Sequence, residues 1–446
     1  MRLEPPGYVL EALEALRGAG FAAYLVGGCV RDACLGRTPL DYDMASSATP
    51  DEVRQVFPHT RVLPTGERHG TVTALLGGNA VEITTFRADG PYSDGRHPDR
   101  VRFSRTVEED LARRDFTVNA MAWNPWDGLT DPFGGRADCE ARVLRAVGDP
   151  RTRFREDALR ILRALRLACQ LGFTIEPKTL RAMEEEAGGL ARVSRERVGG
   201  EINRALLGPH AAWALRAYPR VLFAALPELE PMLHTPQRIR FHAWDVWEHT
   251  LRVLEATPQD LALRWAALFH DSGKPAHISY DPDGTTHFRG HQATSVLLAE
   301  SAMARLRQPK ALLEEVRTLV RRHGDRIGPD NLQRCLSRLG EGTLVKLLLL
   351  QRADMSGKAP DVAAGAPRLD ALILDAKRLV REGAVLGLRD LAVGGNDLLA
   401  LGYEAGPELG AALDRLLRAV LAGRLENRRD ALLAAARERL QAGQER

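Results

Sequence analysis

The apolar positions of the chain follow one pattern in its first third and another in the rest. In residues 1–145, short runs of β-forming residues are separated by turns rich in Gly and Asp. Strands are predicted for three of these runs, AAYLVGG, VTALLGG and AVEITTF. A helix that ends at glycine is predicted just before them, for EALEALRGAG. The pattern therefore indicates an α+β region.

From about residue 151 onward, the apolar pattern is almost entirely helical. One apolar face is formed at helical spacing in REDALRILRALRLACQLGF, by Ala158, Leu162, Leu165 and Cys169. Candidate boundaries rich in Gly or Pro lie near 131–144, 235–244 and 355–367. We therefore predict four regions, which span residues 1–145, 146–235, 236–357 and 358–446.

Length and composition restrict the class of protein. The chain has 446 residues, and one hydrophobic core rarely extends beyond about 250–300, so several domains are expected. With 44% hydrophobic and 27% charged residues, a largely disordered chain is excluded. No apolar run is long enough for a membrane span, and the N-terminus does not resemble a secretion signal. The five cysteines are scattered without a CxxC pair, so we expect a cytoplasmic protein without a disulfide framework.

The net charge of +3 does not indicate a partner, but the choice of basic residues is unusual. Among the 62 basic residues, the lysines are Lys178, Lys274, Lys310, Lys346, Lys358 and Lys377. A GC-rich genome accounts for this bias. A preference for arginine at phosphate or base contacts is the alternative, and it has to be argued site by site.

The first candidate site lies in AAYLVGGCVRDACLGRTPLDYD, residues 22–43. A predicted strand runs into Gly27 and Gly28, which allow a tight turn, and the following helix offers free N–H groups to a phosphate. Asp41 and Asp43 come next, and residues i and i+2 of a strand share one face. Two carboxylates placed in this way can hold the divalent ions of a phosphoryl transfer, and Mg²⁺ suits such ligands.

The order and spacing of the Gly-Gly turn, the Arg-Asp pair and Asp-x-Asp resemble the first motif of one enzyme family. This family comprises the class II tRNA nucleotidyltransferases and the related bacterial poly(A) polymerases, of the DNA polymerase β superfamily. The resemblance implies a polymerase-β-like nucleotidyltransferase head in residues 1–145, followed by all-helical neck, HD and tail regions. It implies metal binding and catalysis by Asp41 and Asp43, and nucleotide binding by Gly28 and Arg31.

Further segments of the head match the same family. Glu82 in VEITTFR is either a third metal carboxylate or a charge at a strand end. Asp94 and Arg96 belong to an Asp-Gly-Arg motif, which in the family lies in a flexible loop needed for adding the final A. The family motif Arg-Arg-Asp-Phe-Thr occurs in EDLARRDFTVNAMAW, and its Arg114 and Asp115 are implied to contact the ribose and phosphates. An ordinary ion pair is the alternative for these two. The hinge between head and neck is matched by DPFGGRAD.

A second candidate site begins at EDALR, where Asp157 and Arg160 are expected on one face of a helix. Cytosine and adenine each present an amino donor beside a ring-nitrogen acceptor, which a carboxylate and a guanidinium can pair. Uracil and guanine would leave buried polar groups unpaired. A surface ion pair is the alternative. The family reads bases with Glu-Asp-x-x-Arg, and the resemblance extends nucleotide binding to Arg163 and Arg166. Structural support for this helix is implied for residues of the motif VSRERVGGE, namely Glu196, Arg197 and Glu201.

Histidine and aspartate recur between residues 242 and 354, and both suit a divalent metal. Their pattern resembles the HD superfamily of metal phosphohydrolases. The resemblance implies four defining metal ligands, His249, His270, Asp271 and Asp354, and two more in two-metal members, His291 and His323. Mg²⁺ or a divalent transition metal is expected there. Packed or surface histidines are the alternative, and His97, His277 and His287 are predicted to be loop residues.

The resemblance covers essentially the whole chain and implies an enzyme that adds CCA to tRNA 3′ ends from CTP and ATP, with release of pyrophosphate and a need for Mg²⁺. The tail, with GPELG at a helix start, is either a tRNA contact or a plain helical cap. An enzyme that adds only the final A, or a poly(A) polymerase, is the first alternative. An HD-type metal phosphohydrolase that acts on RNA ends or nucleotides is the second. An RNA-binding protein without catalysis would be expected to lack Asp41 or Asp43, and both are present.

Overall fold

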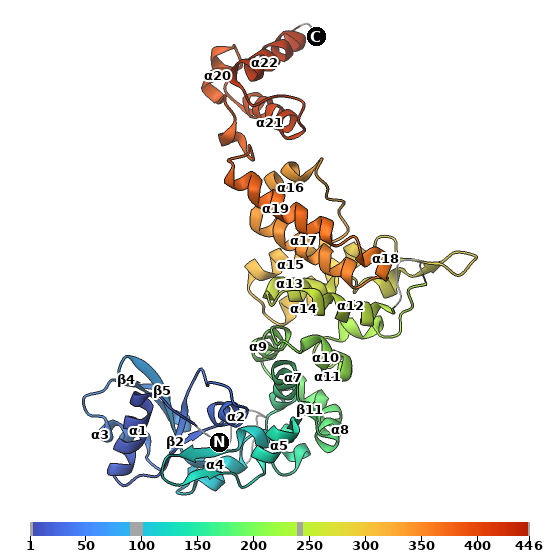
Figure 1. The fold of residues 1–446 in the computed structure, drawn as a ribbon. Coiled ribbons are helices and arrows are strands. Elements are labelled where there is room, and N and C mark those ends of the chain that lie inside the picture. The colour runs from blue at the N-terminus through green and yellow to red at the C-terminus, as the bar shows by residue number, and fades with distance from the viewer. Residues whose placement is uncertain (1–2, 90–100, 239–243, 445–446) are drawn as a thin grey trace. The chain divides into compact units, whose positions relative to one another are not determined.

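The computed structural model describes residues 3–89, 101–238 and 244–444. The chain forms two compact units, Met1–Glu230 with Arg305–Arg307, and Pro231–Ala304 with Gln308–Arg446. In Figure 1, the first unit runs from blue to green and the second from green to red. The predicted loop residues Asp94 and Arg96, together with His97, lie outside the described residues.

The first unit begins with a head that is built on a seven-stranded sheet of order β3-β4-β5-β2-β1-β8-β9. Paired strands of this sheet are antiparallel, except for β2 and β5, which are parallel. The bounds of the strands are β1 Ala23–Val26, β2 Asp43–Ser46, β3 Val62–Gly66, β4 Thr71–Leu76, β5 Asn79–Thr85, β8 Ala122–Asn124 and β9 Gly128–Thr130; β6 Arg87–Asp89 and β7 Val101–Phe103 form a separate pair. The three predicted strands are confirmed as β1, β4 and β5.

The helices of the head are α1 Gly7–Gly18, α2 Gly28–Cys34, α3 Pro50–Val56, α4 Val107–Ala112 and α5 Gly135–Ala141. The predicted helix before the first strand is confirmed as α1. Val26 of β1, Ala45 of β2 and Leu111 of α4 belong to one buried apolar cluster. This cluster fixes the end of β1, the start of β2 and the end of α4 beside one another, and the candidate site is built from these three places.

The remainder of the first unit is helical, as predicted. Its elements are β10 Val143–Leu144, α6 Pro150–Glu156, α7 Leu159–Leu171, β11 Thr174–Ile175, α8 Pro177–Glu186, α9 Arg195–Leu206, α10 Ala211–Ala217 and α11 Pro219–Phe223. The predicted apolar face of α7 is confirmed, because Leu162, Leu165 and Cys169 are buried. Helix α9 packs against α7 and brings the motif VSRERVGGE to it.

The predicted helix through residues 156–160 is wrong at its start. Helix α6 ends at Glu156, Asp157 is extended with φ −144° and ψ 103°, and α7 begins at Leu159. The cause is a local hydrogen bond: the backbone N–H of Leu159 donates to Asp157 Oδ1 at 3.0 Å. An aspartate side chain that accepts such a bond competes with the helix for its backbone, so the chain turns between α6 and α7.

The predicted strand that carries both Asp41 and Asp43 is also shorter than expected. Strand β2 begins at Asp43, which is paired with Val26 of β1, and Asp41 precedes the strand in an irregular segment. Since Val26 is the last residue of β1, the pairing stops there and leaves Asp41 without a place in the sheet. The two carboxylates are therefore positioned by different kinds of backbone.

The second unit is a helical body with a smaller C-terminal group of helices. Its elements are α12 Val246–Ala256, α13 Leu261–Phe269, β12 Ser279–Tyr280, β13 Thr286–His287, α14 His291–Arg305, α15 Lys310–Arg322, α16 Leu332–Leu339, α17 Glu341–Ser356, α18 Pro360–Ala363, α19 Pro367–Arg381, α20 Gly395–Ala400, α21 Pro407–Leu421 and α22 Arg429–Gln444. Helices α12, α13, α15 and α17 pack together, whereas α20, α21 and α22 share a separate apolar cluster. Within the described ranges, no helix has the length and apolar character that a membrane crossing requires.

Candidate active site and metal centre

A pocket of about 350 Å³ opens in the first unit where β1 ends. Six of its described lining residues are arginines, and the full lining is Gly27, Gly28, Arg31, Asp43, Arg113, Arg114, Asp115, Asn119, Arg160, Arg163, Arg166 and Leu167. We call it the arginine pocket. It brings together eight of the predicted site residues, namely Gly28, Arg31, Asp43, Arg114, Asp115, Arg160, Arg163 and Arg166.

The Gly-Gly turn forms one wall of the arginine pocket. Gly27 has φ +75°, a left-handed conformation that favours glycine, and it caps α2, which begins at Gly28. A side chain on Gly27 would place its Cβ only 2.9 Å from Arg114 Nη1, so the guanidinium lies directly against the bare backbone. The turn therefore brings backbone N–H groups and an arginine to the same place, which suits a phosphate.

Each arginine that lines the pocket is held by a carboxylate. Arg31 pairs with Asp32 at 2.8 Å, and its Nη1 also donates to Asn119 Oδ1 at 2.8 Å. The remaining pairs are Arg113 with Asp110 at 2.6 Å, Arg114 with Asp110 at 3.1 Å, Arg160 with Glu156 at 2.6 Å, Arg163 with Asp115 at 2.8 Å and Arg166 with Glu201 at 2.6 Å. Fixed guanidinium groups bind an anion without losing further side-chain freedom, so the pocket is pre-organised for a polyanion.

Asp43 supplies the negative charge at the edge of this pocket. Partial burial and the nearby Glu82 raise the pKa of Asp43, and Arg114 offsets part of the effect. Glu82 is close because the parallel register pairs Met44 of β2 with Ile83 of β5, which places Asp43 and Glu82 at equivalent positions. Asp41 is exposed and adds to the negative charge at Asp43. Carboxylates that disfavour one another's ionised form fit a divalent cation between them.

Asp157 and Arg160 are not paired with each other, so the alternative of an Asp–Arg ion pair between them is wrong. The expectation of one shared helix face is also wrong, because Asp157 precedes α7. Asp157 Oδ2 accepts from Arg197 Nη2 of α9 at 2.9 Å. Arg160 donates to Glu156 Oε2 at 2.6 Å and to the backbone carbonyl of Arg113 at 3.1 Å. Because α6 and α7 meet at Asp157, the two side chains take separate partners. Each is nevertheless fixed, as a base-reading pair requires.

The predicted support from α9 is present at two of its three residues. Arg197 holds Asp157, and Glu201 accepts from Arg166 Nε at 2.6 Å. Glu196 is different, because its carboxylate pairs with Arg307 rather than with a residue of α6 or α7. The prediction for Glu196 rested on its position in the motif alone. Glu196 is exposed in the first turn of α9, where its ion pair does not involve α6 or α7.

Some residues of the pocket were missed. Arg113 and Asn119 line it, and Asp110 holds two of its arginines without being exposed itself. A signal was present in the sequence EDLARRD, where an aspartate precedes two arginines by three and four residues. In isolation that spacing is typical of a surface ion pair, which is why the burial of Asp110 could not be foreseen.

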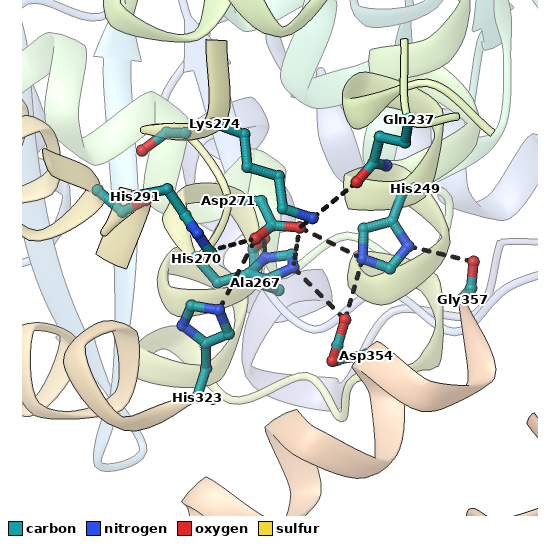
Figure 2. Close-up of polar contacts among 12 residues, drawn as sticks. Gln237, His249, Ala267, His270, Asp271, Lys274, His291, His323, Asp354 and Gly357 are labelled. Carbon is teal, nitrogen blue, oxygen red and sulfur yellow. Dashed lines mark hydrogen bonds and ion pairs between the residues drawn. The ribbon is translucent and has the colours of Figure 1, made fainter. Parts of the chain in front are cut away.

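The second unit brings together all six predicted metal ligands, which Figure 2 shows pointing toward one another. We call His249, His270, Asp271, His291, His323 and Asp354 the His-Asp cluster. Two subsets can each hold an ion: His249 with His270 and Asp271, and Asp271 with His291 and His323. Asp271 belongs to both. Its Oδ2 lies 3.2 Å from His270 Nε2, and its Oδ1 lies 3.1 Å from His291 Nε2.

Backbone carbonyls orient the four imidazoles of the cluster. The Nδ1 atoms of His270, His291 and His323 face the carbonyls of Ala267, Phe288 and Val320, respectively, at 2.7–2.8 Å. His249 Nδ1 faces the Gly357 carbonyl at 3.1 Å. In a neutral ring, a proton on Nδ1 leaves the Nε2 lone pair directed at the centre of the cluster.

Burial and charge also favour a cation in the cluster. Nε2 of His270 and Nε2 of His291 are buried, and both lie against the carboxylate of Asp271. Burial would raise the pKa of Asp271, but His270 and Lys274 hold it well below its usual range. Burial lowers the pKa of His323 to about 4, so this ring is neutral at pH 7. The carboxylate of Asp271 raises the pKa of His270 despite the burial of that ring, so in the absence of a metal His270 holds a proton more readily than a free imidazole. A divalent ion would displace this proton, and carboxylates with imidazoles are the donor set that such an ion needs, so the residues fit the expected ion.

His277 and His287 also belong to the described part of this region, and both lie outside the cluster. His277 Nε2 contacts the Thr294 hydroxyl at 2.7 Å, and His287 Nε2 contacts Asp281 at 2.6 Å on the surface. His287 lies in the short strand β13 rather than in a loop, and His277 lies in a single helical turn.

Comparison with known proteins now identifies the family. Family models match the poly A polymerase head domain at residues 23–145, the RNA and SrmB-binding site of polymerase A at 172–233, the HD domain at 241–355 and tRNA nucleotidyltransferase domain 2 at 372–436. A CCA-adding enzyme of Geobacillus stearothermophilus is 34% identical over 98% of both chains, and that of Geobacillus thermodenitrificans is 35% identical over the same shares. The chain belongs to the family of CCA-adding enzymes.

Solved structures of this family share the fold. The CCA-adding enzyme of Bacillus stearothermophilus, in complex with CTP, matches with a TM-score of 0.74 and 30% identity over 99% of both chains. The enzyme of Thermotoga maritima, complexed with tRNA, matches with a TM-score of 0.63 and 20% identity over 98% of this chain and 97% of that one. The matched range of the poly A polymerase head domain, residues 23–145, includes the segment from Gly27 to Asp115. The matched range of the HD domain, residues 241–355, contains the whole His-Asp cluster.

Proposed function

We propose that this CCA-adding family member extends tRNA 3′ ends with C, C and A from CTP and ATP and releases pyrophosphate. The observation that carries the proposal is the arginine pocket, in which Asp43, the Gly27 turn and six described arginines surround one cavity. A nucleoside triphosphate carries the negative charge that such a pocket attracts. The names of the relatives, one of them solved with CTP, support the same substrate class.

The two ends of the nucleotide are assigned to different walls of the pocket. We assign the triphosphate to Gly28, Arg31 and Arg114, where the bare turn and the start of α2 offer N–H groups. Asp115 and Arg163 also line the pocket and form an ion pair at 2.8 Å. The base is assigned to Arg160, which lines the pocket, and to Asp157, which lies outside that lining and is held by Arg197. Their guanidinium and carboxylate match the pairing edge of cytosine and adenine. Arg166 completes this side.

The reaction joins the tRNA to the α-phosphorus of the nucleotide. The terminal 3′-oxygen forms a bond to this phosphorus while the bond to the bridging oxygen breaks, the hydroxyl proton is lost to solvent, and pyrophosphate leaves. Asp41 and Asp43 would hold Mg²⁺, which would supply charge stabilisation for the phosphoryl oxygens and lower the pKa of the hydroxyl. The arginines bind the β- and γ-phosphates and hold the α-phosphorus in line with the attacking oxygen. A tRNA substrate fits the cytoplasmic location that is expected for this protein.

A contact with the body of the tRNA is proposed for the C-terminal helices. A cleft of about 300 Å³ lies among α21 and α22, with an apolar floor that includes Leu416 and Ala436. Its arginines are Arg415, Arg418, Arg424 and Arg439, each of them exposed. Arginines around an apolar floor suit a phosphate backbone with an unstacked base.

A second activity is proposed for the His-Asp cluster, because its imidazoles and carboxylates meet in a buried centre. A divalent ion bound there would activate water for attack on a phosphate ester. Metal analysis of the purified protein, combined with phosphate release from p-nitrophenyl phosphate in the presence of Mn²⁺, tests this activity. Bound metal with phosphate release supports it, whereas a metal-free protein without release rejects it.

The main proposal is tested on a tRNA that lacks its CCA end. The protein is incubated with CTP alone, with ATP alone and with both, and the 3′ ends are sequenced. We expect CC with CTP alone and CCA with both nucleotides. Addition of A only, and only to a tRNA that already ends in CC, would replace the proposal by an A-adding enzyme.

A further inference from the structure

Asp110 is a buried carboxylate behind the wall of the arginine pocket. It lies in α4 and has 0% of its surface exposed. Arg113 Nε and Nη2 donate to its Oδ1 at 2.9 and 2.6 Å, and Arg114 Nη2 donates to its Oδ2 at 3.1 Å. One carboxylate therefore holds two guanidinium groups, one on each oxygen.

Both arginines held by Asp110 face the nucleotide side of the wall. Arg113 and Arg114 line the arginine pocket, and Arg114 Nη1 lies against the bare backbone of Gly27. A second bond from Arg114 Nη1 reaches the Asn119 carbonyl at 3.4 Å and is long. The direction of the Arg114 guanidinium is thus set mainly by Asp110.

The charge of Asp110 is maintained inside the protein. Burial would raise the pKa of this carboxyl, but Arg113 and Arg114 hold it below its usual value. A buried ionised carboxylate with two charge-assisted partners is costly to disturb, because removal of its charge leaves the arginines uncompensated. Since it is fully buried, Asp110 cannot touch a substrate and acts only through its partners.

We propose that Asp110 is a positioning residue for nucleotide addition, which aims Arg113 and Arg114 at the triphosphate. The inference rests on the proposed nucleotide-binding role of Arg114. It differs from a purely structural role, in which Asp110 would stabilise the end of α4 and leave the kinetics of the folded enzyme unchanged. Misplacement of a binding group by about 1 Å costs about 100-fold in rate.

The experiment compares Asp110→Asn with wild type in steady-state addition of CTP and of ATP. We expect kcat/KM to fall about 100-fold for both nucleotides alike, because the affected arginines lie on the phosphate side. Asp51→Asn is the matched control, since Asp51 of α3 also pairs with an arginine three residues later, Arg54 at 2.7 Å, but its side chain is exposed. A loss below threefold in a folded Asp110→Asn protein would overturn the proposal.

A double-mutant cycle shows whether Asp110 acts through Arg114. In the Arg114→Met background, Asp110→Asn should cost clearly less than in wild type, because one of the two arginines that it aims is no longer there. Full additivity of the two losses overturns the proposal. If Arg114→Met alone leaves addition unchanged, the proposed role of Arg114 fails first, and a wild-type enzyme that adds neither CTP nor ATP rejects the proposed function itself.

A second variant keeps the test decisive if Asp110→Asn does not fold. The double variant Asp110→Asn/Arg113→Met replaces both charged members of the Asp110–Arg113 ion pair by neutral side chains. It should disturb folding less than Asp110→Asn alone, which leaves the Arg113 charge without its partner. It is compared with Arg113→Met alone. A further loss of about tenfold in kcat/KM is expected from the released Arg114, and equal values for the two variants overturn the proposal.

Discussion

In the arginine pocket of the first unit, guanidinium groups face the cavity and carboxylates hold them in place. In the His-Asp cluster of the second unit, carboxylates and imidazoles face one another, and lysines hold the carboxylates: Lys274 pairs with Asp271 at 2.7 Å and Lys358 with Asp354 at 2.6 Å. The groups that face the centre match the charge of the expected ligand, a triphosphate or a metal ion. The groups behind them carry the opposite charge and fix the direction of each side chain.

The two regions also differ in the residue that carries their positive charge. Arginine makes several fixed hydrogen bonds and suits a phosphate, whereas lysine is a single charge on a flexible stem. Lysines are six of the 62 basic residues, yet both cluster carboxylates pair with one. A genomic preference for arginine explains the composition as a whole. It does not explain these two positions, where a rigid guanidinium would compete with a metal ion for both oxygens of a carboxylate.

The largest effect that separates the two regions is expected from Asp43→Asn. If Asp43 holds the proposed metal ion, loss of this carboxylate removes a ligand from the ion that would stabilise the transferring phosphoryl group, so nucleotide addition should fall by about three orders of magnitude. The metal content of the His-Asp cluster should not change. Addition is measured with tRNA and CTP, and metal by elemental analysis of the same preparation. Near-normal addition by the folded variant contradicts the assignment of Asp43.

The next effect concerns selectivity and is expected from Arg160→Ala. In the proposed base site, cytosine would keep only its contact with Asp157 once the guanidinium is removed, and UTP would no longer be rejected by mismatched polar groups. The ratio of kcat/KM for CTP to that for UTP should fall about 100-fold. Competition between labelled CTP and UTP measures this ratio. An unchanged ratio means that the base is read elsewhere in the pocket.

The smallest effect is expected from Lys358→Met, beside the cluster. Asp354 then keeps a buried charge without its cation, so the metal-free variant should unfold several degrees below wild type. Addition of Mn²⁺ should raise the unfolding midpoint more in the variant than in wild type, because the ion replaces the lost charge. Lys346→Met is the control, since Lys346 is on α17 but pairs with Asp260 and Glu315 instead. Equal responses of both proteins to Mn²⁺ would count against this role of Lys358.

Much of the head pocket could be predicted because its residues follow local rules. A strand that ends at Gly27-Gly28 and a helix behind it are encoded within a short segment, and the arginines of α7 recur every three residues. The metal ligands of the second unit were named from a family pattern, and their convergence depends on packing among α12, α13, α15 and α17. Spacing along the chain contains no such information, so the shared Asp271 and its distances came only from the structure.

The sequence predictions failed at two kinds of position. At one kind, a side chain takes a hydrogen bond that the helix backbone would otherwise make; at the other, the role of a residue depends on whether it is buried. Asp157 was placed inside a helix by its spacing to Arg160, but its carboxylate binds the N–H of Leu159 and ends the regular helix there. Asp110 was overlooked because a buried and an exposed Asp–Arg pair have the same spacing in sequence. Tertiary contacts distinguish them, and those contacts join α4 to elements far along the chain.

The central claim is that the arginine pocket adds nucleotides and that the His-Asp cluster is a separate metal centre. The most direct test measures nucleotide addition and bound metal in one preparation of His270→Ala. The account predicts that metal affinity falls about 10- to 100-fold, because a ligand is lost, while addition of CTP and ATP stays within twofold of wild type. Loss of both properties to the same extent would contradict the claim and make the cluster a structural support of the polymerase.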